Sequence, residues 1–204
     1  MQKIDYKKQL HPLYNGKVGE LVQVDVPRLQ YLMIDGHGDP NTSPEYVAAV
    51  ETLFPVAYAL KFMSKREHDK DFAVMPLEGL WWSKDMDDFV TGNKSSWEWT
   101  MMILQPEWIT KDMFLAAVEQ VRTKKNPPLL SKIRFETYEE GRSVQVMYVG
   151  AYSEEGPTIM KLHEYIHEHG GKLAGDTKRH HEIYLGDPRR TAPDKLKTII
   201  RQPF

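Results

Sequence analysis

The alternation of apolar and polar positions predicts strands and helices in a regular order along the first half of the chain. Residues 28–36 form an apolar run that ends at Gly36, as a buried strand would. Ser43 is a favourable N-cap and Pro44 suits the first helical position, so we expect a helix from there to about Lys65. Two aromatic-rich strands, 72–82 and 97–105, should follow, joined by a connection over 84–94.

The second half repeats this order. A helix is predicted over 112–124, followed by strands 133–139 and 144–152, which we interpret as a hairpin around Glu140 and Gly141. Residues 157–169 should form a helix that ends at Gly170 and Gly171. The last two strands are expected over 181–185 and 196–201.

Strand, helix, strand, strand is thus the order both from Tyr31 and from Val144, which indicates an internal duplication. We predict an α+β fold in which two β-α-β-β units form one antiparallel sheet, with helices on one face and a ligand cleft along the pseudo-twofold seam. Residues 1–25 are expected to form an N-terminal arm. Residues 26–204 are expected to form the domain, with halves at about 26–106 and 130–204.

Composition narrows the class of function. The net charge of −2 argues against nucleic acid as a partner, because phosphate binding requires an excess of positive charge. Cysteine is absent, which excludes disulfides, thiolate nucleophiles and cysteine-based zinc sites. We find neither a signal peptide nor an apolar run of the ~20 residues that a membrane helix needs, so we expect a cytoplasmic protein that is a monomer or a weak homodimer.

Tryptophan is concentrated in one stretch, since four of the five lie between Trp81 and Trp99. Because side chains alternate along a strand, Trp82 shares a face with Glu78, and Trp97 shares a face with Trp99. Indole faces stack on flat rings and attract cations. We therefore favour a binding wall. The alternative is that these rings are core residues beneath the helices.

Glu182 is a second candidate, because it lies within a short apolar strand and shares a face with Tyr184. A carboxylate at such a position is costly unless it is paired or solvated, and a cationic ligand in a cleft would supply the partner. The alternative is a surface carboxylate on an open sheet face. We expect the preceding His180 and His181 to be exposed.

The sequence from His163 to His167 matches H-E-x-x-H, the helix motif of zinc proteases. The longer form of that motif requires a third histidine where this chain has Leu173. On the predicted helix His163 flanks the apolar stripe and His167 lies farther round, near the polar boundary, so we expect both to face water at the edge of the helix. A zinc protease is therefore the third of our hypotheses, and we assign neither a metal nor any other cofactor.

Residues 181–203 resemble the C-terminal signature of stand-alone GyrI-like small-molecule-binding proteins, and residues 57–61 and 77–82 are also similar to that family. The resemblance implies two β-α-β-β units around a shared cleft. Relatives in multidrug-sensing regulators bind lipophilic cations between aromatic walls and one buried Glu, which by its place in the motif would be Glu182. Some stand-alone members are similar to hydrolases that open strained or electrophilic small molecules with a pocket Glu, Tyr and Trp. The DNA-binding domain of the regulators has no counterpart in this sequence.

Our leading hypothesis is a multidrug-type site that binds aromatic, cationic, lipophilic molecules. Glu182 would supply the charge and Glu78 would be a second acid. The alternative is a hydrolase in which Glu182 acts as general base and Tyr148 as proton donor. The expected stacking residues are Trp82, Trp97, Trp99, Tyr148 and Tyr184.

Overall fold

The fold consists of two β-α-β-β units, as predicted, in a computed structural model that describes residues 2–83, 93–173 and 178–204. The connection expected between the aromatic strands falls largely in 84–92, outside the described residues. The first unit comprises β2 (Val22–His37), α3 (Pro44–Glu67), β4 (Leu77–Trp82) and β5 (Glu98–Gln105). The second comprises β6 (Arg134–Val149), α6 (Gly156–Glu168), β7 (His180–Tyr184) and β8 (Lys197–Pro203).

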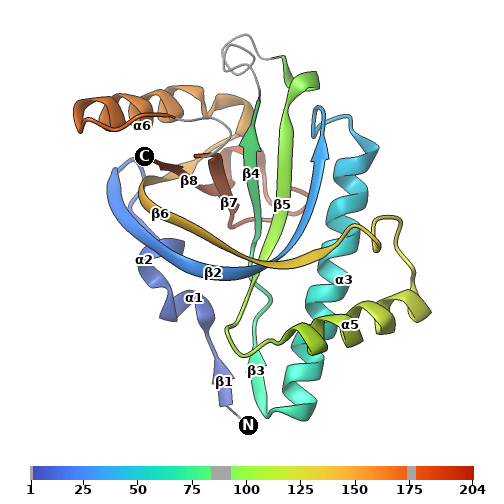
Figure 1. Cartoon of the computed structure of the whole chain (residues 1–204). Helices are drawn as coiled ribbons and strands as arrows, with labels where there is room; N and C mark the ends of the chain where they lie inside the picture. Colours follow the sequence, from blue (N-terminus) through green and yellow to red (C-terminus); the bar gives the residue numbers. More distant parts are fainter. Residues whose placement is uncertain (1, 84–92, 174–177) are drawn as a thin grey trace.

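The six long strands form one antiparallel sheet, which confirms the predicted fold class. Their order is β2-β5-β4-β7-β8-β6, and the sheet closes into a barrel because β6 also pairs with β2 (Figure 1). Helices α3 and α6 pack on the outside of this barrel. The two units meet at β4 and β7, where the register sets Gly79 opposite Glu182.

The predicted hairpin around Glu140 and Gly141 is wrong. Residues 134–149 form the single strand β6, which pairs with β2 over most of its length, from Met33↔Arg134 to Val22↔Gln145. Gly141 adopts a φ of +71° inside the strand without reversing its direction. Its cross-strand neighbour is Val26 of another strand, so the turn signal of a glycine was outweighed by long-range pairing.

The aromatic strand expected over 72–82 is split in two. β3 (Lys70–Phe72) pairs in parallel with β1 (Gln2–Ile4) as a separate two-stranded sheet. β4 starts only at Leu77, directly after Pro76, which has no backbone N–H to donate to a ladder. Strand pairing to the barrel therefore begins where the aromatic residues are concentrated.

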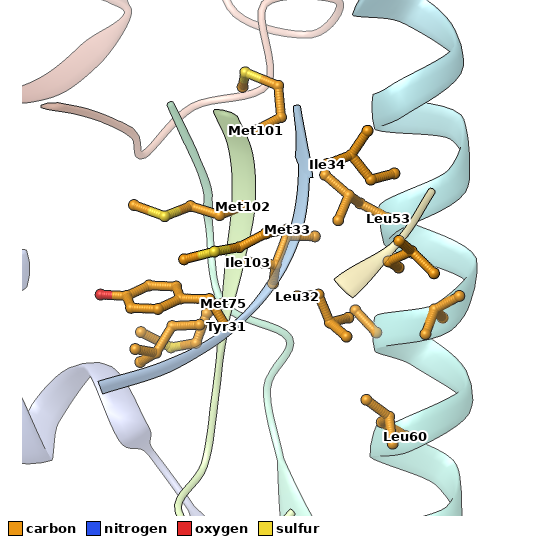
Figure 2. Packing of buried hydrophobic residues seen from close by; sticks show 14 of the residues in the cluster. Tyr31, Leu32, Met33, Ile34, Leu53, Leu60, Met75, Met101, Met102 and Ile103 are labelled. Carbon is orange, nitrogen blue, oxygen red and sulfur yellow. The ribbon is translucent and has the colours of Figure 1, made fainter. Parts of the chain in front are cut away.

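The main core lies between the barrel and α3. Leu32 and Ile34 of β2 point toward Leu53 and Leu60 of α3, while Tyr31 points to the opposite side (Figure 2). α3 is long and apolar enough to cross a membrane by length and composition, but half of that stretch is buried within the protein. Its apolar residues thus serve as the core of this fold, and α5 (Lys111–Lys124) packs against it.

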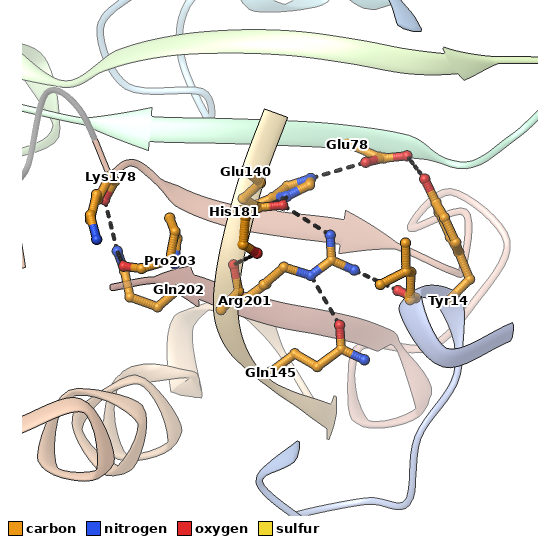
Figure 3. A network of polar contacts seen from close by, with 12 residues as sticks. Tyr14, Glu78, Glu140, Gln145, Lys178, His181, Arg201, Gln202 and Pro203 are labelled. Carbon is orange, nitrogen blue, oxygen red and sulfur yellow. Dashed lines mark hydrogen bonds and ion pairs between the residues drawn. The ribbon is translucent and has the colours of Figure 1, made fainter. Parts of the chain in front are cut away.

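A buried polar network connects the barrel to the N-terminal segment, which contains α1 (Tyr6–Gln9) and α2 (His11–Tyr14) (Figure 3). Tyr14 donates to Glu78 at 2.6 Å, and His181 lies 3.0 Å from both Glu78 and Glu140. Arg201 donates to Glu140 at 3.1 Å and to the carbonyl of Leu13 at 2.6 Å. Residues of the predicted N-terminal arm are therefore hydrogen-bonded to side chains of the barrel strands.

The charged groups of this network stabilise one another in their ionised forms. Burial lowers the pKa of His181, but Glu140 outweighs it and raises that pKa to about 9. Burial likewise raises the pKa of Glu140, but His181 and Arg201 outweigh it and hold that pKa at about 2. His181 is fully buried, so our expectation that it is exposed is wrong; the ion pairs with Glu78 and Glu140 offset the burial of its charge.

Candidate functional site

A groove of about 2120 Å³ runs over the outside of β4 and β7, between the start of α3 and the start of α6. Four of the predicted site residues line it: Trp82, Trp97, Glu182 and Tyr184. Trp81 and Tyr46 also line it from the first unit, and Glu155 from the second. The groove therefore follows the seam between the two units, where we expected a cleft.

Glu182 projects from β7 into this groove with 15% of its side chain exposed. Tyr184 donates to one carboxylate oxygen at 2.7 Å, and His180 Nε2 lies 3.2 Å from the other. Burial acts to raise the pKa of Glu182, but the interactions with His180 and Tyr184 outweigh it and hold the pKa below its ordinary value. Glu182 is consequently an ionised carboxylate at neutral pH. His180 is half-buried rather than exposed.

Glu155 is a second carboxyl group in the groove, positioned at the start of α6 just after the turn Tyr152–Glu154. Only 3% of the residue is exposed, and no described residue donates a hydrogen bond to its Oε1 atom. Burial and the adjacent charge of Glu182 raise the pKa of Glu155 to about 9, so Glu155 keeps its proton at neutral pH. Of these two neighbouring carboxyl groups, Glu155 is therefore the one that can donate a proton and Glu182 the one that can accept it.

Aromatic rings surround these acids. Trp81 Nε1 donates to the Tyr184 hydroxyl at 3.1 Å, and the Trp81 ring stacks on Tyr46 with centroids 6.2 Å apart. Trp97 packs edge-on to Trp81 at 5.9 Å. Gly79 makes room for this arrangement, because a Cβ there would lie 2.7 Å from Trp81 Nε1. Burial and nearby Glu182 raise the pKa of Tyr184 well above its ordinary value, so it remains a proton-bearing donor.

The structure does not bring the other three predicted site residues to the groove. Trp99 is fully buried beneath Tyr46, with its indole over Gly36, where a Cβ would lie 2.1 Å from the ring. Glu78 is fully buried in the polar network inside the barrel. Tyr148 donates to the carbonyl of Ala151 at 3.1 Å.

The sequence profile of the GyrI-like small molecule binding domain matches residues 20–203 of this chain. The chain belongs to that family. This GyrI-like chain therefore contains a domain that binds small molecules. Among curated proteins, none matches the sequence.

Solved structures similar to this GyrI-like chain include two from Listeria innocua. An uncharacterized conserved protein is 37% identical, with 98% of each chain covered and a TM-score of 0.86. A hydrolase is 38% identical, with 99% of each chain covered and a TM-score of 0.84. The EcmrR C-terminal domain is only 10% identical, with 90% of this chain and 96% of that chain covered and a TM-score of 0.54, so it shares the fold alone.

The H-E-x-x-H residues do not assemble into a metal centre. His163 is half-buried and lines the groove, contrary to our expectation, whereas His167 is exposed. Burial, with a contribution from His180, lowers the pKa of His163 to about 4, so its ring is neutral. In the described ranges 2–83, 93–173 and 178–204, no three His, Asp or Glu side chains form a group that could hold a metal ion.

Sequence reasoning did not select Trp81, Tyr46, Tyr152 or Glu155 for the site. For Trp81 a signal was present, because it shares a face with Gly79, and the close approach that glycine permits indicates the face of β4 that lines the groove. Glu155 lay before a predicted helix with nothing to distinguish it from its neighbour Glu154. Only the packing of α6 against β6 and β8 brings that carboxyl to Glu182.

Proposed function

We propose that this protein hydrolyses an electrophilic aromatic small molecule in the groove between its two units. The observation that carries this proposal is the pairing of an ionised Glu182 with a proton-bearing Glu155 among aromatic side chains. Two carboxyl groups whose environments drive their pKa values apart form a general base and a general acid. The similar hydrolase from Listeria innocua supports this reaction class.

In the proposed step, Glu182 accepts a proton from a water molecule while the water oxygen bonds to the electrophilic carbon of the substrate. The bond from that carbon to its leaving oxygen breaks, and this oxygen takes the proton of Glu155. The pair ends with the proton on Glu182, and exchange with solvent restores the starting state. Tyr184 and His180 hold the two oxygens of Glu182 in place, while Trp81 and Trp97 would stack on the ring of the substrate.

A second candidate function is binding without turnover, of the multidrug type, with an aromatic cation as ligand. The ionised state of Glu182 favours it, because a buried carboxylate gains most from a positive partner. Under this hypothesis, Glu155 takes part in no proton transfer and only affects the charge of the site. We expect either activity in the cytoplasm.

Turnover of 1-naphthyl acetate and of styrene oxide tests the proposal, with product formation followed at pH 7. We expect Glu182→Gln and Glu155→Gln each to lower kcat by about 10²-fold or more, since each removes one partner of proton transfer. Glu154→Gln is the matched control, because that side chain is exposed and precedes Glu155 directly. Tight binding of an aromatic cation with no turnover of either substrate would support the second candidate instead.

A further inference from the structure

The outer face of α3 carries an apolar stripe that stays exposed in the described part of the chain. Val47, Tyr58 and Phe62 are 53%, 48% and 47% exposed. Val50 and Phe54 lie between them and are half-buried. The spacing of three or four residues places all five on one side of the helix, away from its buried side. Single exposed apolar residues are ordinary, but a continuous stripe of them indicates an interaction surface.

The stripe connects two hollows of the surface. At its start, Val47, Val50 and Phe54 belong to the wall of the groove that holds the two acids. Toward its end, Phe54, Tyr58 and Phe62 line a second hollow of about 400 Å³ between α3 and α5. The groove itself, at about 2120 Å³, exceeds the ~300–1,000 Å³ of ordinary small-molecule pockets. A partner seated on the stripe would therefore narrow the groove as well as bury the apolar side chains.

Charges of opposite sign lie beside the two ends of the stripe. Near the start, Glu51 is exposed and lines the groove. The other end is basic, with four lysines in or beside the second hollow: Lys61, Lys65, Lys124 and Lys125. Asp71 binds the first two of these, at 3.1 and 3.4 Å, so the four lysines keep an excess of positive charge. The surface thus has an acidic end, an apolar middle and a basic end.

We propose that two copies of this chain pair through the stripe, with their α3 helices antiparallel about a twofold axis, so that each copy covers the α3 wall of the other's groove. A twofold interface requires a surface that is complementary to itself. A stripe with one acidic and one basic end meets this requirement when the helices run antiparallel, because each end then meets its opposite.

The residue numbers fix the expected contacts. With the axis midway between Phe54 and Tyr58, Phe54 of one copy faces Tyr58 of the other. The same axis sets Glu51 opposite Lys61 and Val50 opposite Phe62. One helix face is smaller than the ~800 Å² per partner of a standard interface, so we expect a weak dimer. The pairing is independent of the proposed hydrolysis, which uses acids from a single copy.

Sedimentation velocity at protein concentrations from about 1 to about 200 µM tests the pairing, because a weak dimer dissociates within this range. We expect a monomer–dimer equilibrium whose dissociation constant rises at least about 10-fold in Phe62→Ser, since this ring would be buried in the interface. Leu115→Ser is the matched control. Leu115 of α5 is similarly exposed, at 53%, but lines neither hollow, so the equilibrium should stay unchanged.

Charge reversal at exposed positions tests the antiparallel arrangement. At low ionic strength, Glu51→Lys should weaken the dimer about 10-fold, because it sets two basic ends against each other. Lys124→Glu combined with Lys125→Glu should also weaken it, because Glu51 then meets an acidic end. The triple variant restores opposite charges and should recover most of the loss, as a double-mutant cycle requires.

Naphthalene-2-carboxamide, a neutral aromatic probe, tests whether the second copy covers the groove. Its dissociation constant, measured by calorimetry, should be at least about 3-fold lower for the dimeric wild type than for Phe62→Ser, because Phe62 lies outside the groove. A protein that is monomeric at every concentration, a dimer that Phe62→Ser leaves intact, or a triple variant without recovery would overturn the proposal. Equal affinity of the probe for dimer and monomer would refute the covering of the groove.

Discussion

The proton on Glu155 has a measurable consequence for stability. In the folded protein this carboxyl has a pKa of about 9 instead of its ordinary 4.5, so between these two values the folded state binds a proton that the unfolded state has released. Stability must then fall as the pH rises through this range, which is the reverse of the behaviour of a salt-bridged carboxylate. Glu155→Gln removes the titration while its neutral amide can still donate to Glu182.

The magnitude follows from the shift. At pH 8, which is about 3.5 units above the ordinary pKa of a glutamate, the full shift would lower the free energy of unfolding by about 5 kcal/mol, at 1.36 kcal/mol per unit. The pair titrates jointly and the groove admits water, so we expect less than half of this. Glu155→Gln should raise the free energy of unfolding by about 2 kcal/mol at pH 8 and by less than about 0.5 kcal/mol at pH 4.5.

Urea denaturation followed by tryptophan fluorescence measures this difference. With a slope of about 2 kcal/mol per molar urea, the midpoint of the variant should lie about 1 M above that of the wild type at pH 8. Glu154→Gln, on the exposed neighbouring residue, should show no such trend. A difference between Glu155→Gln and wild type that stays constant from pH 4.5 to pH 8.5 would refute a shared proton and, with it, the general acid.

Three further changes probe the surroundings of the acid pair. Tyr14→Phe leaves an oxygen of buried Glu78 without its donor and should cost about 1–3 kcal/mol in chemical denaturation; an unchanged midpoint would mean that water replaces the hydroxyl. Gly79→Ala would place a Cβ 2.7 Å from an indole nitrogen of the same strand and should weaken naphthalene-2-carboxamide about 10-fold, unless the indole rotates freely. His180→Phe should raise the pKa of Glu182, so the acidic limb of the plot of turnover against pH should move to higher pH. An acidic limb at the same pH as in the wild type would show that Tyr184 alone lowers that pKa.

The elements of this fold were largely predictable because its signals are local. Ser43 caps α3 by accepting from the backbone N–H of Tyr46, and the helix ends within two residues of the prediction. Repetition of the strand and helix order then indicated a single antiparallel sheet. Closure of that sheet depends on β6 pairing with β2, which no local pattern encodes. In addition, Gly141 inside β6 has the positive φ that is typical of a turn, so the sequence pattern there wrongly predicted a hairpin.

The site was predictable only in part, for a related reason. The alternation of β7 correctly grouped Glu182 with Tyr184, which share the groove. Alternation cannot say which face of a strand meets ligand and which meets the barrel interior, so Glu78 was proposed as an acid of the cleft although it pairs with His181 inside the barrel. The partner that changes the chemistry, Glu155, comes from the end of a helix whose placement is a tertiary property.

Duplication itself suggests why the acids lie where they do. At the seam the register sets Gly79 opposite Glu182, and two residues further along each strand come Trp81 and Tyr184, which hydrogen-bond to each other. Positions that face each other across the seam thus carry different side chains. The glycine leaves room for the Trp81 indole and the Tyr184 hydroxyl, since a Cβ at Gly79 would lie 2.7 Å from Trp81 Nε1 and 3.2 Å from that hydroxyl. A symmetric pair of carboxylates at this point would repel across adjacent strands. Because the first unit supplies room and rings while the second supplies Glu182 and Glu155, one asymmetric site arises from two similar halves.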